Sequence, residues 1–230
     1  CELLFEIMKK IEIACFNLES ALIAQKAGVD RVELCADMSV GGTTPTIEII
    51  KQAREHLTID LYVMIRPRGG NFVYSEAEFE QMKSEIETIK KLDVNGFVFG
   101  ILKDDNTINI EQNKVLVELV KPFSCTFHRA FDEVLNVEKA LENVISCGFS
   151  TILTSGTFPN VMEGKEVLKQ LVNQAKNRIE IMPGGGLRST NVSALNEMVS
   201  ANWYHSSAIT DGSEIASPEE IMQLKNKLQS

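Results

Sequence analysis

Several acidic, basic and imidazole side chains in this chain stand at the ends of short apolar runs. His128 and Arg129 end one such run in CTFHRAFD, Glu33 lies in RVELC, and Arg66 follows LYVMI. A carboxylate or an imidazole can exchange protons near neutral pH, and an arginine can bind an acidic group. We therefore interpret Glu33, His128 and Arg66 as candidate catalytic residues, with Arg66 as the expected partner of Glu33. The alternatives are a structural Glu33–Arg66 ion pair and a core histidine that is hydrogen-bonded to a neighbour.

A glycine-rich segment, MPGGGLRSTN at 182–191, has the composition of an anion-binding loop. Glycines let the backbone approach a ligand and present its N–H groups, and Ser189 or Thr190 can cap a following helix whose N-terminus favours an anion. Arg66 and Arg68 together are expected to clamp a second acidic group by bidentate contact. The alternative is a tight turn in which the glycines serve only geometry. The predicted anion-binding residues are Arg68, Gly184, Gly185, Gly186, Ser206 and Ser207.

The chain has five scattered cysteines and no CxxC pair, which predicts reduced thiols in a cytoplasmic protein. Cys15 and Cys35 end two apolar runs that are expected to form neighbouring strands. Two thiolates so placed can hold a soft ion such as Cu(I). Burial in the core as small apolar residues is the alternative for both cysteines.

Short β-rich runs alternate with helical patterns along the whole sequence. The predicted strands are Ile11–Cys15, Arg31–Cys35, Ile59–Arg66, Gly96–Gly100, Phe123–His128, Ser150–Ser155, Arg178–Pro183 and Trp203–Ser206. The predicted helices are Leu18–Ala27, Ile47–His56, Glu76–Leu92, Glu111–Val120, Val137–Cys147, Glu163–Ala175, Asn191–Ser200 and Pro218–Leu228. Strands recur at intervals of roughly 27 residues, which is typical of an α/β protein with the (β/α)8 TIM-barrel fold. We expect one barrel domain over residues 8–230.

The barrel prediction gathers the polar residues at one place, because active sites of this fold lie at the carboxyl ends of the strands. Alternation along a strand then assigns their faces. If His128 points into the barrel, Thr126 does too, while Cys125 and Phe127 face the helices. If Glu33 points inward, Cys35 shares its side of the strand.

Composition restricts the classes of partner. The formal net charge of −9 argues against nucleic acid and anionic membranes as partners, and no apolar run approaches the ~20 residues of a membrane helix. The segment CELLFEIMKK lacks the positive leader of a signal peptide. We interpret residues 1–7 as an extension that precedes a natural start at Met8.

Several long segments together resemble the CutC family, which is linked to copper homeostasis. These segments are EIACFNLESALIAQKAGVDRVELCADMSVGGTTPT, VMIRPRGGNFVYS, GFVFGIL, TFHRAFD, ILTSG, PGGGLRSTN and HSSA. The resemblance runs from about Lys10 to Ala208. It implies a cytoplasmic TIM barrel, a homo-oligomer, and Cys15 and Cys35 as copper(I) ligands.

Two functional hypotheses follow, with a scaffold carrying a vestigial site as a third. By resemblance, the chain is a copper homeostasis protein that binds copper(I). By its residues, it is an enzyme acting on a small anionic or phosphorylated metabolite, by isomerisation, aldol chemistry or hydrolysis. No lysine ends a predicted strand, so a Schiff base is not expected. No organic cofactor is predicted.

Overall fold

Eight parallel strands form a barrel in the computed structural model, which describes residues 8–229. The predicted extension over residues 1–7 lies outside this range. The strands are β1 (Lys10–Cys15), β2 (Arg31–Leu34), β3 (Asp60–Met64), β4 (Gly96–Phe99), β5 (Ser124–Phe127), β6 (Thr151–Thr154), β7 (Glu180–Pro183) and β8 (Trp203–Ser206). Sequential strands pair from β1 to β7, and β8 pairs with β1. A parallel bridge between Gly184 and His205 joins β7 to β8 and closes the barrel.

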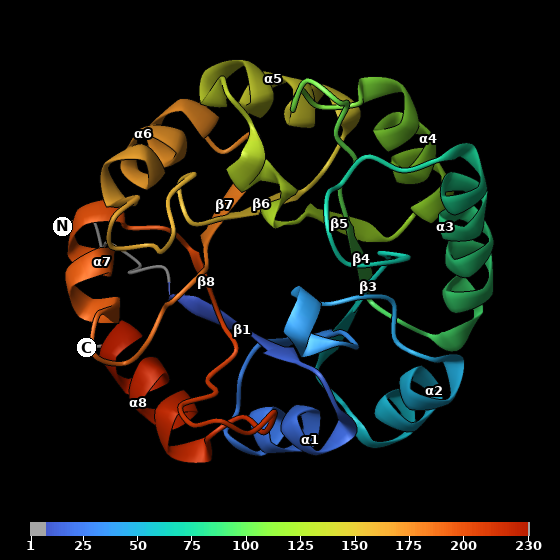
Figure 1. Cartoon of the computed structure of the whole chain (residues 1–230). Helices are drawn as coiled ribbons and strands as arrows, with labels where there is room; N and C mark the ends of the chain where they lie inside the picture. The colour runs from blue at the N-terminus through green and yellow to red at the C-terminus, as the bar shows by residue number, and fades with distance from the viewer. Residues whose placement is uncertain (1–7, 230) are drawn as a thin grey trace, which may run out of the picture.

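A ring of helices surrounds the strands (Figure 1). They are α1 (Leu18–Lys26), α2 (Ile47–His56), α3 (Glu76–Ile89), α4 (Ile110–Val120), α5 (Val137–Cys147), α6 (Lys165–Ala175), α7 (Val192–Val199) and α8 (Pro218–Leu228). Three short 3-10 helices, which the sequence patterns did not predict as separate elements, are η1 (Met38–Val40), η2 (Lys90–Leu92) and η3 (Arg129–Glu133). The (β/α)8 prediction is therefore confirmed. Within residues 8–229 no helix has the length and apolar character needed to span a membrane.

Side-chain caps explain where several helices begin. The Asn17 side chain accepts a hydrogen bond from Ser20 N, and Asn136 accepts one from Lys139 N. Ser75 and Glu78 form a reciprocal capping box before α3. These caps fix the starts of α1, α3 and α5. Ser189 and Thr190, which were predicted to cap the helix after the glycine loop, do not cap α7, whose N-cap position is Asn191.

Strand alternation divides the side chains between two environments. Ile13, Val32, Cys125 and Phe127 belong to the large apolar cluster between strands and helices. Polar side chains fill much of the barrel interior, including Glu12, Arg31, Glu33, Thr126 and His205, all of them buried. The predicted faces of His128 and Cys125 are confirmed.

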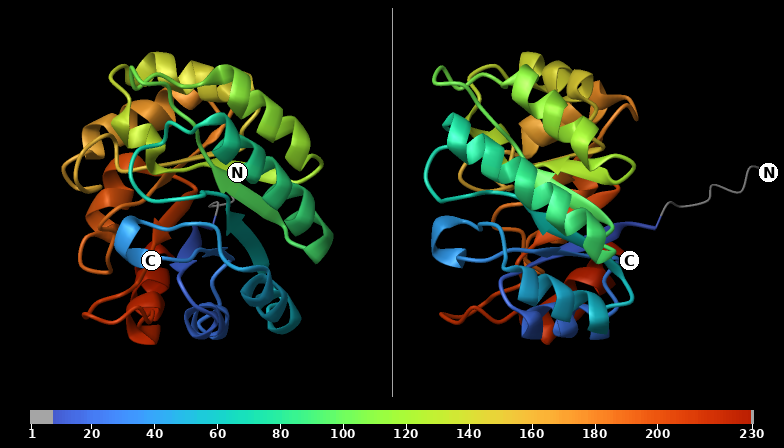
Figure 2. Two further views of the ribbon diagram at one scale, coloured as in Figure 1. Left: turned by 45° about the vertical axis from the view of Figure 1, so that its right-hand side comes forward. Right: turned by 90° about the vertical axis from the view of Figure 1, so that its right-hand side faces the viewer.

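The loops that follow the strands gather at one end of the barrel. In the right-hand view of Figure 2, the blue segment around η1, the cyan loop before α3 and the red loop before α8 all project to the left. This end carries the carboxyl ends of the parallel strands, where the fold places its active sites.

Candidate active site

A cavity of about 250 Å³ opens at this end of the barrel. Its wall combines carboxylate, imidazole, guanidinium, thiol and glycine groups from seven of the eight strands or the loops after them. The lining residues are Ala14, Phe16, Glu33, Cys35, Gly41, Met64, Arg66, Phe72, His128, Arg129, Leu153, Gly185, Gly186, Arg188, His205, Ser206 and Ser207. The predicted gathering of polar residues at one mouth is thus what the structure shows.

A buried hydrogen-bonded chain of charged groups crosses the barrel at the base of the cavity. Glu12 Oε2 accepts a hydrogen bond from Arg31 Nε at 2.5 Å, and Glu12 Oε1 lies 2.8 Å from His205 Nδ1. His205 Nε2 lies 3.8 Å from Glu33 Oε2. Strand register produces this order, because Glu12 is the pairing partner of both Arg31 on β2 and His205 on β8.

These neighbours shift the pKa values of Glu12 and Glu33 in opposite directions. Burial raises the pKa of Glu33 to about 7, although the charge of His205 partly opposes this. Burial also raises the pKa of Glu12, but Arg31 and His205 outweigh it, so the pKa of Glu12 falls below its usual range. Burial alone would lower the pKa of His205. The hydrogen bond to Glu12 and the charge of Glu33 outweigh burial, so the pKa of His205 is raised. Glu33, with a pKa of about 7, and His205, with a raised pKa, therefore form an acid–base pair.

The predicted Glu33–Arg66 ion pair is absent, and strand register explains why. Glu33 pairs with Tyr62 on β3, whereas Arg66 follows four residues later, about 13 Å further along the chain at ~3.3 Å per residue. The Arg66 guanidinium instead donates to the backbone carbonyls of residues 40, 42 and 70. It also stacks over the Phe72 ring, 4.7 Å from the centroid. Arg66 thus places a positive charge at the cavity wall. Among the described residues, no carboxylate forms an ion pair with it.

Arg68, the other arginine of the predicted clamp, is not part of the cavity lining. Its Nε lies 2.5 Å from Glu78 Oε1, and its terminal nitrogens donate to backbone carbonyls of the same loop. It therefore ties the loop after β3 to the start of α3.

The glycine loop places unengaged backbone donors in the cavity. Across residues 8–229, the N–H groups of Gly186 and Ser207 have no hydrogen-bond acceptor, whereas the N–H of Gly185 faces β8 at the Gly184–His205 bridge. Arg188 lies beside them and donates to Leu187 O, Ile209 O and Ser206 Oγ. These segments follow β7 and β8, the usual phosphate-binding position in this fold. Gly184, although predicted with them, belongs to the barrel closure and does not line the cavity.

Asp132 holds Arg129 against this loop. Arg129 Nε donates to Asp132 Oδ2 at 2.7 Å and its Nη2 to Ser155 Oγ at 3.0 Å. A Cβ atom on Gly185 would lie 3.1 Å from Arg129 Cζ, so the guanidinium packs where a larger residue would place its side chain. Arg129 therefore adds a positive charge beside the backbone donors.

The two cysteines of the predicted copper site face different sides of the barrel wall. Cys15 pairs in register with Leu34, so Cys35, one residue further, points to the opposite face. Cys15 packs in the helix-side apolar cluster, while Cys35 lines the cavity and packs with Met64. Burial, followed by the charge of Glu33, raises the pKa of the Cys35 thiol.

Glu12, Glu33 and His205 also present ligand atoms within 4.8 Å of one another, a spacing compatible with a metal ion. However, both oxygens of Glu12 are engaged, one by Arg31 and the other by His205. The Arg31 charge further opposes a cation at this point. The arrangement suits proton transfer between His205 and Glu33 better than metal ligation.

Sequence reasoning missed Glu12, His205 and Arg188 as members of the site. The available signal was a charged or imidazole residue inside a predicted strand, as in IEIAC and WYHSS. A side chain of this kind on the inward face of a barrel needs a partner from a neighbouring strand. Pairing Glu12 with His205 also required the register between the first and last strands.

Comparison with known proteins supports the barrel fold and identifies the family of the chain. The profile of the CutC family matches residues 9–210. A Homo sapiens protein named copper homeostasis protein cutC homolog is 41% identical over 198 residues, covering 86% of this chain and 72% of that protein. A Vibrio campbellii family protein CutC is 42% identical over 203 residues, covering 87% and 82%. The crystal structure of the putative copper homeostasis protein CutC from Streptococcus agalactiae superposes with a TM-score of 0.84 at 36% identity, covering 88% of this chain and all of that one. The chain belongs to the CutC family.

Proposed function

We propose that this protein is an enzyme that transfers protons on a small anionic metabolite, with a phosphate-like group bound by the loops after β7 and β8. The observation that carries the proposal is the shared cavity: the Glu33–His205 pair faces the same space as the free N–H groups of Gly186 and Ser207. Such a combination supplies both a binding subsite and a general acid or base tuned towards neutral pH.

The charges around the cavity support an anionic ligand. Among the described residues, neither Arg66 nor Arg188 is paired with a carboxylate, and Arg129 shares its charge with Asp132. Three guanidinium groups therefore face a volume sized for a small metabolite. No lysine lines the cavity, which disfavours a Schiff-base mechanism and leaves proton transfer by Glu33 as the proposed chemistry.

The anion subsite is tested by titrating inorganic phosphate into the purified protein by isothermal calorimetry. We expect binding that Arg129→Gln weakens by about threefold or more, because one positive charge is removed beside the subsite. Arg178→Gln is the matched control, since Arg178 is also a half-exposed arginine in an ion pair, with Glu142, but is not part of the cavity lining. Equal phosphate affinity in both variants contradicts the subsite, as does absence of binding to the unmodified protein.

The proton-transfer role is tested with a panel of small phosphorylated carbonyl compounds in D2O, followed by proton NMR. We expect deuterium to enter one member of the panel, and Glu33→Gln to abolish the exchange because the amide cannot accept the proton. Exchange that continues at the original rate in Glu33→Gln excludes Glu33 as the base.

Copper(I) binding is the second candidate function, and the contact between Cys35 and Met64 favours it. A Cβ atom on Gly42 would lie 2.9 Å from Met64 Sδ and 3.4 Å from Cys35 Cβ, so the thiol and the thioether stand side by side at the cavity wall. Both are soft ligands suited to Cu(I). Cys15 would contribute its thiolate only after leaving the helix-side cluster.

A competition titration of Cu(I) against a chromophoric chelator tests this candidate. Cys35→Ser is expected to lower Cu(I) affinity by at least tenfold, whereas Cys125→Ser serves as the control because this buried thiol faces the helices. Comparison with Cys15→Ser then shows whether Cys15 is a ligand. Unchanged affinity in Cys35→Ser contradicts a copper site in the cavity.

A further inference from the structure

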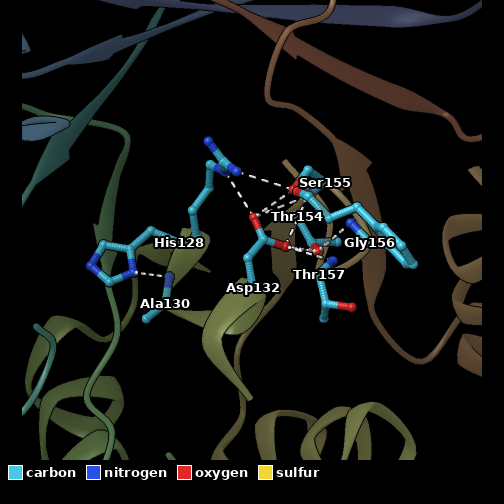
Figure 3. Close-up of polar contacts among 9 residues, drawn as sticks. His128, Ala130, Asp132, Thr154, Ser155, Gly156 and Thr157 are labelled. Carbon is cyan, nitrogen blue, oxygen red and sulfur yellow. Dashed lines mark hydrogen bonds and ion pairs between the residues drawn. The ribbon is translucent and has the colours of Figure 1, made fainter. Parts of the chain in front are cut away.

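His128 holds a fixed orientation in the cavity wall directly after β5. Its ring is 3% exposed, and its centroid lies 4.8 Å from that of the Phe72 ring. Its Nδ1 accepts a hydrogen bond from the backbone N–H of Ala130 at 3.3 Å, at the start of η3 (Figure 3). A ring nitrogen that accepts carries no proton, so the neutral ring of His128 has its proton on Nε2.

The Nε2–H group of His128 is a buried donor with no acceptor among the described residues. Leaving such a group unpaired costs about 1–3 kcal/mol, so native structures rarely do so without a reason. Because His128 lines the cavity, a ligand bound there can supply the missing acceptor.

The surroundings keep His128 neutral. Burial and then the charge of Arg66 lower its pKa to about 3, far below physiological pH. In the segment that follows it, Arg129 is positive and is paired with Asp132, and Glu133 is also acidic. Glu33 belongs to β2 and is linked to His205. His128 is therefore a poor proton shuttle, contrary to the acid–base role that its sequence position suggested.

We propose that His128 Nε2–H donates a hydrogen bond to a carbonyl oxygen of the substrate, and that the substrate class is therefore a small carbonyl compound bearing a phosphate-like group. This inference rests on the proposed function. A neutral N–H donor matches a neutral acceptor, and the terminal nitrogens of Arg66 that would attract a carboxylate already bind backbone carbonyls.

With His128 as the donor to the carbonyl oxygen, each step of the proton transfer can be written. The carbon–hydrogen bond next to the carbonyl breaks, and its proton moves to the carboxylate of Glu33. The electron pair forms a carbon–carbon double bond, while the carbonyl π pair moves onto oxygen. His128 stabilises that developing negative charge, since a preorganised donor in a buried site gains strength as charge appears on its acceptor. Return of a proton to the same carbon, while the oxygen electron pair re-forms the carbonyl, completes the exchange without any oxidant or cofactor.

Two phosphonates that differ only in a carbonyl test the inference by calorimetry: acetonylphosphonate and propylphosphonate. We expect the unmodified protein to bind acetonylphosphonate about three- to tenfold more tightly, the range that one hydrogen bond supplies. His128→Ala should remove this preference while leaving propylphosphonate affinity unchanged. His128→Gln, which retains an N–H donor, should restore part of the preference. His56→Ala is the control, because His56 is exposed on α2.

The outcomes separate the inference from the proposed function. If neither phosphonate binds, the anion subsite fails and the inference falls with it. If both bind with equal affinity, or if the preference persists in His128→Ala, only the carbonyl assignment is overturned. Nitrogen-15 NMR of the unmodified protein gives a readout independent of variant folding. We expect the Nε2–H tautomer without titration from pH 5.5 to 8.5, and a titrating imidazolium overturns the assignment.

Discussion

The two carboxylates inside the barrel illustrate how neighbours decide the state of a residue. Glu12 has both oxygens engaged by cations or cation-forming groups, so its negative charge is favoured. Glu33 has one oxygen without a hydrogen-bond partner and the other 3.8 Å from His205 Nε2, so burial is the largest cause of its raised pKa. Proton exchange with a ligand therefore falls to Glu33, while Glu12 orients His205.

Glu33→Gln should make the stability of the protein less dependent on pH. Because the folded pKa of Glu33, about 7, exceeds its usual value of 4.5, the stability linked to this group is fully present below pH 4.5 and is lost as pH rises through 7. Glutamine imitates the protonated acid and avoids this loss. We expect the difference in unfolding free energy between variant and unmodified protein to rise by on the order of 2 kcal/mol from pH 4.5 to 8. Urea denaturation at both pH values measures it.

The exposed residue Glu197 on α7 provides the matched control for this prediction. Glu197→Gln should show a difference that is constant across the same pH range. A flat difference for Glu33→Gln as well would mean that Glu33 titrates at its ordinary pKa, and the acid–base role proposed for it would lose its basis.

At the residue scale, alternation predicted faces correctly but could not predict partners. The inward direction of Glu33, Cys35 and His128 follows from the two-residue period of a strand. The partner of Glu33 depends on how far each strand is shifted against its neighbour, and the residues of one strand do not encode that shift. This is why Arg66 was predicted beside Glu33 and why His205 was missed.

At the scale of the element, the segment after β5 acts as a connection between two strand ends. η3 carries Asp132, whose carboxylate accepts hydrogen bonds from the loop after β6, namely from Thr154 Oγ1, Ser155 N, Ser155 Oγ and Thr157 N (Figure 3). The same carboxylate binds Arg129. The short helix thus fixes Arg129 against the glycine loop. Sequence patterns identified the polar residues here but not η3, because five residues are too few for a helical period to be visible.

Asp132→Asn should destabilise the protein by about 1–3 kcal/mol, because the amide nitrogen would face N–H and O–H donors that now point at a carboxylate oxygen. The Asp132 side chain is only 11% exposed, so water cannot replace the lost acceptor. Chemical denaturation followed by circular dichroism measures the change. Asp104→Asn in the exposed loop after β4 is the control and should stay within about 0.5 kcal/mol of the unmodified protein. A similarly small effect for Asp132→Asn would show that the two loops are held together by other contacts.

At the scale of the whole molecule, an acid–base residue of the cavity lies where the ring of strands closes. Sequential strands are joined by ladders, whereas β7 and β8 are connected through the Gly184–His205 bridge. His205 is therefore a closure residue and a member of the acid–base pair at once. The eight-strand architecture could be predicted because each βα unit repeats a local pattern. The contact between the first and last strands could not, because it depends on the geometry of the closed ring.

Gly184→Ala tests this closure, since the bridge leaves no space for a side chain. A Cβ atom on Gly184 would overlap Leu153 Cδ1 and would lie 2.9 Å from His205 Cβ. The end of Leu153 could turn aside, but the His205 Cβ atom is fixed by its strand, so β7 and β8 must separate locally. We expect a loss of about 1–3 kcal/mol, as for other overpacked interiors, and a thermal midpoint lowered by roughly 3–10 °C. Gly212→Ala is the control, because its Cβ atom would meet nothing within 4 Å, and its midpoint should not change. Equal thermal midpoints for both variants would mean that β7 and β8 can separate without loss of stability. His205 would then have room to move away from Glu33.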